Sequence, residues 1–286
     1  MNRLSKISWT QFPWNPWWGC QKCGAECQHC YIDRNLRKHH LDAFAADGPY
    51  RTQTLNDPYT WQRELDNLNR HAPVQQYARV FTCSHGDFFD RRVDNRGWRG
   101  EAWQVIRSTP NLVYLVLTKR PERIANHLPQ DWGEGYKNVW LGTSVGCNAT
   151  LGRIDHLRKV PVHPEAVRFL SCEPLLEDIA PRINLDGIGW LIVGGESGDN
   201  PEYLWTPEMK WSPENFPGRR TMKIPWAYEL MTAARRAAIP FIFKQVTASR
   251  SGQGADALGL IYHEFPNPPN GGIWWVAPNP LKVIQQ

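Results

Sequence analysis

Six short apolar runs recur along the chain, and each ends at polar or charged residues. A weaker seventh run, residues 6–10, precedes them. Strands that are almost continuously apolar are typical of a parallel sheet, because helices cover the faces of such a sheet. The sequence therefore predicts a parallel sheet whose strands all lead into polar residues. The six runs are residues 79–83, 113–117, 139–142, 167–170, 190–193 and 240–243.

Helical patterns separate the apolar runs, and this alternation predicts the fold class. We expect helices at residues 59–69, 98–108, 150–159 and 226–238, with Pro58 and Pro225 near two of the helix starts. The alternation is typical of an α/β fold, here a partial or closed (β/α) TIM-like barrel of six to seven parallel strands. An open doubly wound sheet is the alternative, but no GxGxxG motif follows the first strand.

Two segments interrupt the alternation. Residues 198–225 contain many turn formers, which predicts a long loop over the mouth of the barrel. Residues 249–286 are rich in Gly, Pro and Asn and include Trp274 and Trp275. We expect a barrel domain at 1–248, with a cysteine-bearing loop at 15–31, and a C-terminal extension at 249–286 that packs on the barrel.

Four of the seven cysteines fall within eleven residues, at Cys20, Cys23, Cys27 and Cys30. The N-terminus has no apolar stretch of the kind found in secretory signals, and no run approaches the ~20 apolar residues of a membrane span. We therefore expect a cytoplasmic protein with no membrane partner. In a reducing compartment, clustered thiols more often hold metal or do redox chemistry than form disulfides. The other three cysteines are expected to be small buried apolar residues.

Two kinds of metal site compete for the four clustered cysteines. Zinc could take all four as thiolates. However, zinc ribbons usually separate their two CxxC pairs by a dozen or more residues, and here residues 24–26 alone intervene. An iron–sulfur cluster accepts closer spacing. Three ligands, Cys27 and Cys30 with either Cys20 or Cys23, would leave one iron open as a reaction site, so we expect a cluster.

The charge and aromatic content are compatible with a nucleic-acid partner. The net charge is +5, and the chain has 15 tryptophans. Basic residues could contact phosphates, and tryptophans beside them could stack on bases. The candidate phosphate contacts are Arg91, Arg92, Arg96, Arg99, Arg219, Arg220, Lys223, Arg235 and Arg236. The candidate stacking residues are Trp205, Trp211 and Trp226.

Several motifs occur together and in order, and they carry a resemblance to a known family. Trp14-Asn15-Pro16 precedes Gly19-Cys20, and residues 27–31 read CQHCY. Further along are LTKRPER at 117–123, LGTSV at 141–145, RFLSCEPLL at 168–176, VGGESG at 193–198 and PFIFKQ at 240–245. The chain resembles the three-cysteine phage protein family, which is similar to the radical S-adenosylmethionine (SAM) superfamily. The TKRPE and GGESG blocks are the most specific, and the tail is not covered.

The resemblance implies a 4Fe-4S cluster, SAM as a second cofactor, and ligands at Cys20, Cys27 and Cys30, with Cys23 as an alternative first ligand. It also implies an electron donor such as flavodoxin or ferredoxin, and a host-cytoplasm location if the protein is phage-encoded. Strand position then suggests roles at the rim. Ser84 and Asp87 would take the SAM ammonium, Lys119 or Arg120 its carboxylate, and Thr143 or Ser144 the ribose. Glu173, Glu196 and Lys244 are the candidate catalytic residues, placed to orient SAM or substrate.

The resemblance also suggests a substrate. We expect a radical rearrangement of a hypermodified thymine in phage DNA, such as isomerisation of an N-linked to a C-linked glycyl group, in the service of restriction evasion. Two alternatives remain open. One is a radical SAM enzyme that acts on a peptide or a small metabolite. The other is a zinc-binding module without catalytic activity.

Overall fold

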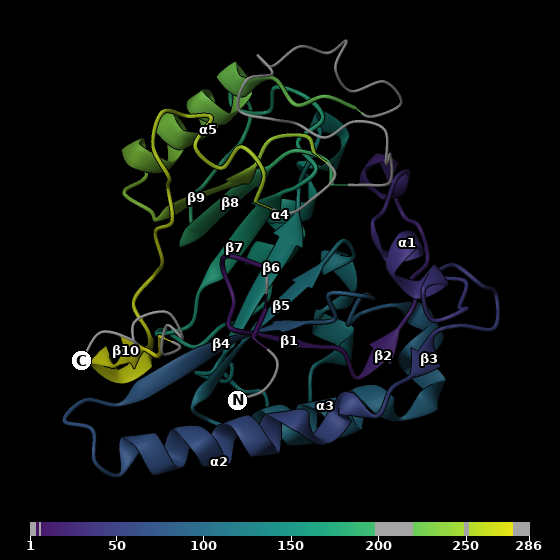
Figure 1. Ribbon diagram of the computed structural model, residues 1–286, viewed down its shortest axis with the longest axis vertical. Coiled ribbons are helices and arrows are strands. Elements are labelled where there is room, and N and C mark those ends of the chain that lie inside the picture. Colours follow the sequence, from purple (N-terminus) through teal and green to yellow (C-terminus); the bar gives the residue numbers. More distant parts are fainter. Residues whose placement is uncertain (1–3, 6, 198–219, 249–251, 277–286) are drawn as a thin grey trace, which may run out of the picture.

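Seven parallel strands form a curled sheet in a computed structural model that describes residues 4–5, 7–197, 220–248 and 252–276. They lie side by side in chain order, and the sheet curves into a half-barrel (Figure 1). The α/β class and the partial TIM-like barrel predicted from the sequence are therefore confirmed. The strands are β1 (Phe12–Trp14), β4 (Gln76–Thr82), β5 (Leu112–Thr118), β6 (Val139–Ser144), β7 (Arg168–Cys172), β8 (Trp190–Gly194) and β9 (Phe241–Gln245).

Side chains alternate between the two faces of the sheet, as the strand period of two requires. In β5, Leu112, Tyr114 and Val116 face the helices, whereas Val113 and Leu115 face the hollow of the half-barrel. The same alternation brings Lys119, Ser144 and Ser171, at or near the ends of their strands, to the side of the hollow. This register decides which polar residues can reach a site at the carboxyl ends of the strands.

Helices cover the outer face of the sheet (Figure 1). Their apolar sides share one large core with the outward residues of the strands. The helices are α2 (Asp57–Asn69), α3 (Trp98–Arg107), α4 (Arg153–Arg158) and α5 (Ile224–Arg236). The four expected helices are thus present, although α4 is shorter than predicted because a 3-10 turn, Asn148–Thr150, precedes it.

The predicted first strand at residues 6–10 is wrong. The described residues in this segment form a turn, with the amide of Thr10 donating to the carbonyl of Ile7. The first strand is instead β1, which pairs with β4 in the register Phe12 to Val80. Trp9, which belongs to this turn, packs into the hollow of the half-barrel, and Ile7 packs against the same cluster. The apolar residues that suggested a strand therefore pack in the hollow as part of a turn.

The C-terminal segment connects β9, at one edge of the sheet, with β4, the strand next to the other edge. Residues 262–264 run antiparallel to β9, with the amide of Phe243 donating to Tyr262 and that of Glu264 to Phe241. The chain then crosses to β10 (Ile273–Trp274), which pairs in parallel with the start of β4 (Figure 1). The segment therefore closes the end of the half-barrel opposite the carboxyl ends of the strands.

The segment between β1 and β4 carries small elements that the sequence pattern does not reveal. The short strands β2 (Trp17–Trp18) and β3 (Tyr50–Arg51) pair antiparallel, and α1 (Ile32–Arg37) lies between them in the chain. The cysteine loop connects β2 to α1 and lies over the carboxyl ends of the strands. Of the helices in the described part of the chain, none is long and apolar enough to cross a membrane.

Candidate active site

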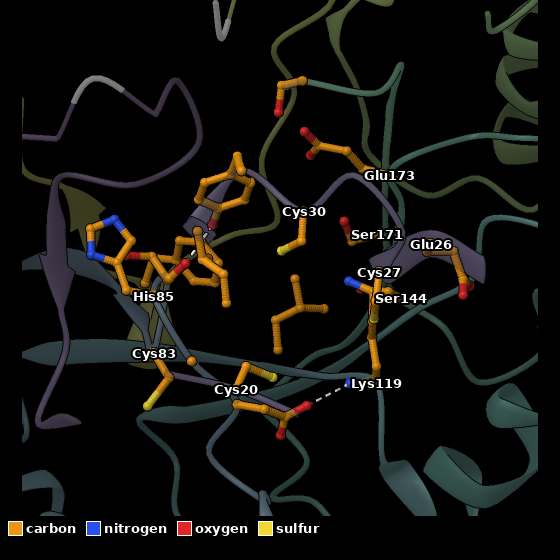
Figure 2. A pocket seen from close by; sticks show the side chains of 18 of the residues that line it. Cys20, Glu26, Cys27, Cys30, Cys83, His85, Lys119, Ser144, Ser171 and Glu173 are labelled. Carbon is orange, nitrogen blue, oxygen red and sulfur yellow. Dashed lines mark hydrogen bonds between the residues drawn. The ribbon is translucent and has the colours of Figure 1, made fainter. Parts of the chain in front are cut away.

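A cavity of about 520 Å³ lies between the cysteine loop and the carboxyl ends of the strands. Its volume is in the range of pockets that hold one small-molecule ligand. The inward residues just beyond the strands form one wall, and the cysteine loop forms the other (Figure 2). Parallel strands bring their carboxyl ends together, so polar residues far apart in sequence meet here. The residues from the strand ends are Ser84, Asp87, Lys119, Ser144, Ser171, Glu173, Glu196 and Lys244.

Cys20, Cys27 and Cys30 all line this cavity, and their side chains lie around its centre (Figure 2). Cys27 is buried and the other two are half-buried, whereas Cys23 is exposed. Cys23 lines the cavity as well, so Cys20 and Cys23 both stay candidates for the first ligand of a metal group. Cys147 and Cys172 are buried apolar residues, as expected, while Cys83 also borders the cavity.

Three arginines hold the cysteine loop against the barrel, and Arg120 is the first. Its Nη1 donates to Oδ2 of Asp87 at 3.0 Å and lies 3.8 Å from Sγ of Cys20. Its Nη2 donates to the carbonyl of Gln21. Asp87 also accepts from the Thr118 hydroxyl at 2.7 Å. A buried ion pair at the end of β5 therefore fixes the first part of the loop.

Arg153 holds the middle of the loop. Its Nη1 lies 2.9 Å from Oε1 of Glu26, whose side chain is fully buried beside Cys27. Arg153 and the amide of Gly146 together lower the pKa of Glu26, although burial opposes them. A Cβ at Gly146 would lie 2.1 Å from the carbonyl oxygen of Pro174, so glycine is required for this close approach.

Arg220 makes the third connection. It forms an ion pair with Glu196 beyond β8 and donates to the carbonyl of Ala25 in the cysteine loop. Glu196 is buried at the cavity wall. Arg220, which the sequence analysis suggested as a phosphate contact, is therefore engaged in positioning the loop.

Lys119 is the cation that faces the thiols. Its Nζ lies 3.3 Å from Oγ of Ser144 at the next strand end. Burial alone would lower the pKa of Lys119, but the nearby Cys27, Cys30 and Glu26 raise it. The lysine is therefore held charged beside sulfur atoms, where it compensates for negative charge that metal-bound thiolates would bring.

The thiols differ in their protonation. Burial, with Asp87, raises the pKa of Cys20 to about 12. Burial also raises the pKa of Cys30, against the effect of Lys119. A hydrogen bond from Cys23 lowers the pKa of Cys27, and Lys119 acts in the same direction. Deprotonated sulfur is what metals bind, so the loop combines one thiol that is readily ionised with two that a metal would have to deprotonate.

Across the cavity from the cysteine loop, Lys244 near the end of β9 forms an ion pair with Glu173, just beyond β7. Both side chains are largely buried and line the cavity. Ser171 of β7 lines it as well, and its inward position follows from the alternation along the strand. Sequence reasoning missed Ser171, although counting every second residue from Phe169 would have found it.

Ser84 and its neighbours form a fixed polar wall. The side chain of Asn15 exchanges hydrogen bonds with the Ser84 hydroxyl, and the amide of His85 donates to Asn15 at 2.7 Å. Tyr31 donates to the carbonyl of Ser84 at 2.5 Å. Burial lowers the pKa of His85 to about 4, so its ring is neutral, and the buried Nδ1 of this ring has no hydrogen-bond partner.

Two expected SAM contacts are placed differently. Thr143 does not line the cavity, because it is an outward residue of β6 and its hydroxyl donates to the carbonyl of Thr118 at 2.9 Å. Asp87 borders the cavity, but Arg120, Thr118 and the amides of Lys119 and Phe89 occupy its carboxylate. The structure thus gives Asp87 the role of anchoring the loop.

Most of the candidate phosphate contacts are engaged within the protein. Arg92 pairs with Asp90, Arg99 with Asp94, and Arg235 with Glu264. Arg96 donates to carbonyls of residues 47–49, and Lys223 lies over the Trp226 ring. Trp205, Trp211 and Arg219 lie outside the described residues. Arg92, Arg96 and Arg99 therefore hold the loops around residues 45–49 and 88–94 in place.

Within the described residues, no three Cys, His, Asp or Glu side chains are gathered closely enough to hold a single metal ion. A lone zinc would need all its sulfurs about 2.3 Å from one point. Each thiolate of an iron–sulfur cluster binds a different iron, so three cysteines that line one cavity are a donor set that such a cluster could use.

Comparisons with known proteins identify the family and no more. A model of the family described as "Protein of unknown function (DUF5131)" matches residues 4–264. No curated protein and no solved structure matches the chain. The matched region contains the half-barrel, the cysteine loop and residues 262–264 beside β9. The chain therefore belongs to the DUF5131 family of proteins of unknown function.

Proposed function

We propose that this protein is a radical SAM enzyme. The observation that carries the proposal is the meeting of Cys20, Cys27 and Cys30 at one cavity on the carboxyl ends of a parallel half-barrel. A 4Fe-4S cluster bound by three thiolates keeps one iron free to bind a second cofactor. With SAM at that iron, the reduced cluster supplies a 5′-deoxyadenosyl radical, which abstracts hydrogen from a substrate.

The residues around the thiols would stabilise the cluster and exclude water. Lys119 and Arg120 supply positive charge next to the sulfurs. Ile32, Leu36 and Ala43 pack behind Cys20 and Cys30 and form an apolar backing. Burial of this kind controls solvent access and tunes the reduction potential of a metal group. Arg120, Arg153 and Arg220 would keep the loop at a fixed distance from the strand ends.

The rest of the cavity would hold SAM and the reacting group. Lys119 faces the thiols and contacts Ser144, and a SAM carboxylate and ribose could be bound by these two residues. Glu173, Lys244 and Glu196 lie on the walls formed by β7, β9 and β8. They present both signs of charge and would orient the amino-acid part of SAM or a charged group of the substrate. We keep them as the candidate catalytic residues.

We propose a hypermodified thymine in phage DNA as the substrate, with an isomerisation as the reaction. The resemblance to the three-cysteine phage family, the net charge of +5 and the size of the cavity support this proposal. A cavity of about 520 Å³ cannot admit a duplex, so the base would have to be extruded from the helix. Enzymes that act on bases commonly meet their substrates in this way.

The cofactor proposal is tested by anaerobic reconstitution with iron and sulfide. Wild-type protein should become brown, contain about four irons per chain, and release 5′-deoxyadenosine from SAM on reduction. Cys27→Ala should lose the colour and the reaction, because one ligand is missing. Cys147→Ala, a buried cysteine outside the cavity, is the matched control and should retain both. Wild-type protein that is colourless and binds one zinc would overturn the proposal.

The substrate proposal is tested by incubating the reduced enzyme and SAM with hypermodified phage DNA and with free modified nucleosides. Digestion and mass spectrometry should reveal a rearranged base that keeps its mass but changes its chromatographic retention and fragmentation. Formation of 5′-deoxyadenosine with no altered base in either substrate would rule out the DNA reaction and leave the peptide or metabolite alternative.

A further inference from the structure

The ion pair of Lys244 with Glu173 differs from the other ion pairs at the cavity. Each of the three arginines described above binds a carboxylate and connects the cysteine loop with the barrel. Lys244 and Glu173 instead bind one another, and neither side chain makes a further hydrogen bond within the described part of the chain. Positioning of the cysteine loop therefore does not explain this pair.

Both side chains of the pair keep unused hydrogen-bonding capacity. An ammonium group and an ionised carboxylate can each take part in several hydrogen bonds. The contact between Nζ of Lys244 and Oε1 of Glu173 uses only part of that capacity. The exposed fractions of the two side chains are 9% and 14%, and both side chains line the cavity. Buried polar groups are rarely left without partners, so a ligand in the cavity is the partner expected for them.

Ser171 adds a hydroxyl group to the same wall. It precedes Glu173 by two residues, which places both side chains on one side of the chain, and both line the cavity (Figure 2). The serines at two other strand ends bind protein side chains, whereas the hydroxyl of Ser171 makes no hydrogen bond within the described residues. Ser171, Glu173 and Lys244, which we call the β7–β9 trio, thus combine an acceptor with two possible donors.

We propose that the β7–β9 trio binds the hydrogen-bonding edge of a pyrimidinedione base, the class to which thymine belongs. That edge presents an N–H between two carbonyl oxygens. Glu173 would accept from the N–H, while Lys244 and Ser171 would each donate to one carbonyl. Enzymes that act on extruded bases commonly read this edge. The inference rests on the proposed function, and it names the residues that would select the substrate base.

The same trio would reject a cytosine-type base. Cytosine presents an amino group in place of one carbonyl and a ring nitrogen without a hydrogen in place of the N–H. Its ring nitrogen would face the carboxylate of Glu173, and two acceptors cannot share a hydrogen bond. A zwitterionic amino-acid group could satisfy Glu173 and Lys244, but it would leave the hydroxyl of Ser171 unused. The presence of that hydroxyl on the same wall therefore favours a base.

Nucleoside binding to the reconstituted protein tests the proposal without turnover. The probes are thymidine, 2′-deoxycytidine and 3-methylthymidine, which lacks the N–H, and isothermal titration calorimetry measures their affinities. We expect wild-type protein to bind thymidine at least about tenfold more tightly than either other probe, because each mismatch leaves a buried polar group without its partner. Glu173→Gln should remove most of this preference, since an amide can both donate and accept.

Ser171→Ala is the second variant, because it removes one hydroxyl and keeps the ion pair. Sulfur accepts hydrogen bonds more weakly than oxygen, so wild-type protein should bind 2-thiothymidine and 4-thiothymidine more weakly than thymidine. In Ser171→Ala one of these two losses should vanish, and the other, which belongs to Lys244, should remain. Ser108→Ala, which changes an exposed serine outside the cavity, is the matched control and should retain both losses.

The outcomes separate this inference from the proposed function. Wild-type protein that binds none of the nucleosides, or binds thymidine, 3-methylthymidine and 2′-deoxycytidine equally well, would overturn the inference. Binding of free glycine that is lost in Glu173→Gln, with no selection among nucleosides, would also overturn it and assign the pair to an amino-acid group. A protein that selects thymidine but forms no 5′-deoxyadenosine from SAM on reduction would instead defeat the proposed function.

Discussion

The two ends of the half-barrel hollow are built from different residues. At the closed end, Trp9, Trp140, Phe169 and Trp190 pack together, and the C-terminal segment adds Phe265 and Trp274. At the open end, the same strands contribute serines, carboxylates and lysines to a cavity beside the cysteine loop. The alternating strands thus supply an apolar core at the closed end and a polar site at the open end. Residues that stabilise the fold and residues that could take part in chemistry therefore lie at different ends of the same strands.

A buried cation, Arg79, lies within the aromatic end. Arg79 is buried there between the rings of Phe265 and Trp274, at 3.8 Å and 4.6 Å from their centroids. Its Nε donates to the carbonyl of Trp9, and burial lowers its pKa to about 9. The arginine is held by ring faces and a carbonyl, so it fastens the C-terminal segment to the sheet. The cations of the open end, in contrast, face thiols and carboxylates.

The largest effect is expected from Arg120→Met at the open end. It leaves Asp87 buried without its ion-pair partner, which should lower the free energy of unfolding by about 3–5 kcal/mol. It also frees Cys20 and Gln21, so reconstituted protein should hold little iron even when folded. Chemical denaturation and iron analysis check the two effects. A variant with full iron content would show that this arginine does not position the loop.

Trp190→Ala tests the closed end with a comparable loss of stability. Trp190 is fully buried against Trp9, Trp140 and Phe169, so truncation should cost about 3–5 kcal/mol. Iron bound per folded chain should stay at the wild-type level, because the thiols lie at the other end. Denaturation followed by tryptophan fluorescence, with iron analysis at low temperature, separates the two readouts. If Trp190→Ala also lowers the iron bound per folded chain, the closed end would be shown to affect the site at the open end, which contradicts the comparison of the two ends.

His85 makes stability depend on pH. Its pKa is about 4 in the folded protein against an ordinary value near 6.5, so the unfolded chain binds a proton more readily between these pH values. The contribution of His85 to the free energy of unfolding should therefore be at its full value above pH 6.5. The free energy of unfolding should fall by up to about 3 kcal/mol as pH drops to 4. His85→Gln should flatten that part of the profile, measured by urea denaturation of the metal-free protein. If the free energy of unfolding of His85→Gln depends on pH as that of the wild-type protein does, a group other than His85 causes the dependence.

Gly142→Ala probes the boundary between the two ends with the smallest expected effect. An added Cβ would lie 2.4 Å from the Phe169 ring, which must shift toward the closed end. Overpacking of this kind costs about 1–3 kcal/mol. Gly152→Ala, where a Cβ meets no atom within 4 Å, is the control and should leave the unfolding midpoint almost unchanged. Equal midpoints for both variants would show that the ring has room to move.

Six of the seven parallel strands, β4 to β9, were predicted because each of them is an apolar run that can be recognised in the sequence alone, whereas β1 was missed. The sequence also placed the cysteines and the charged strand ends, since parallel strands bring these ends together whatever the details of packing. Thr143 lies outside the cavity because it is an outward residue of β6, and counting strand ends without regard to alternation does not reveal this. The inward position of Ser171 follows from the alternation along β7 and could have been predicted.

Other features depend on contacts between distant residues and leave no local signal. The ion pair of Glu26 with Arg153 joins residues 127 positions apart, and Arg220 reaches Ala25 across 195 positions. β10 is two residues long and is defined only by its pairing with β4. The helix α1 has six residues, Ile32–Arg37, and is too short for its period to be recognised in the sequence.

The central claim is that three thiolates leave one iron of a cluster open to SAM. Electron paramagnetic resonance of the reconstituted and reduced protein tests it most directly, with spectra recorded before and after SAM is added. The account predicts a reduced-cluster signal whose g values shift on addition of SAM and are restored when SAM is removed. A cluster signal that does not respond to SAM, or a protein that binds zinc and gives no signal, would contradict it.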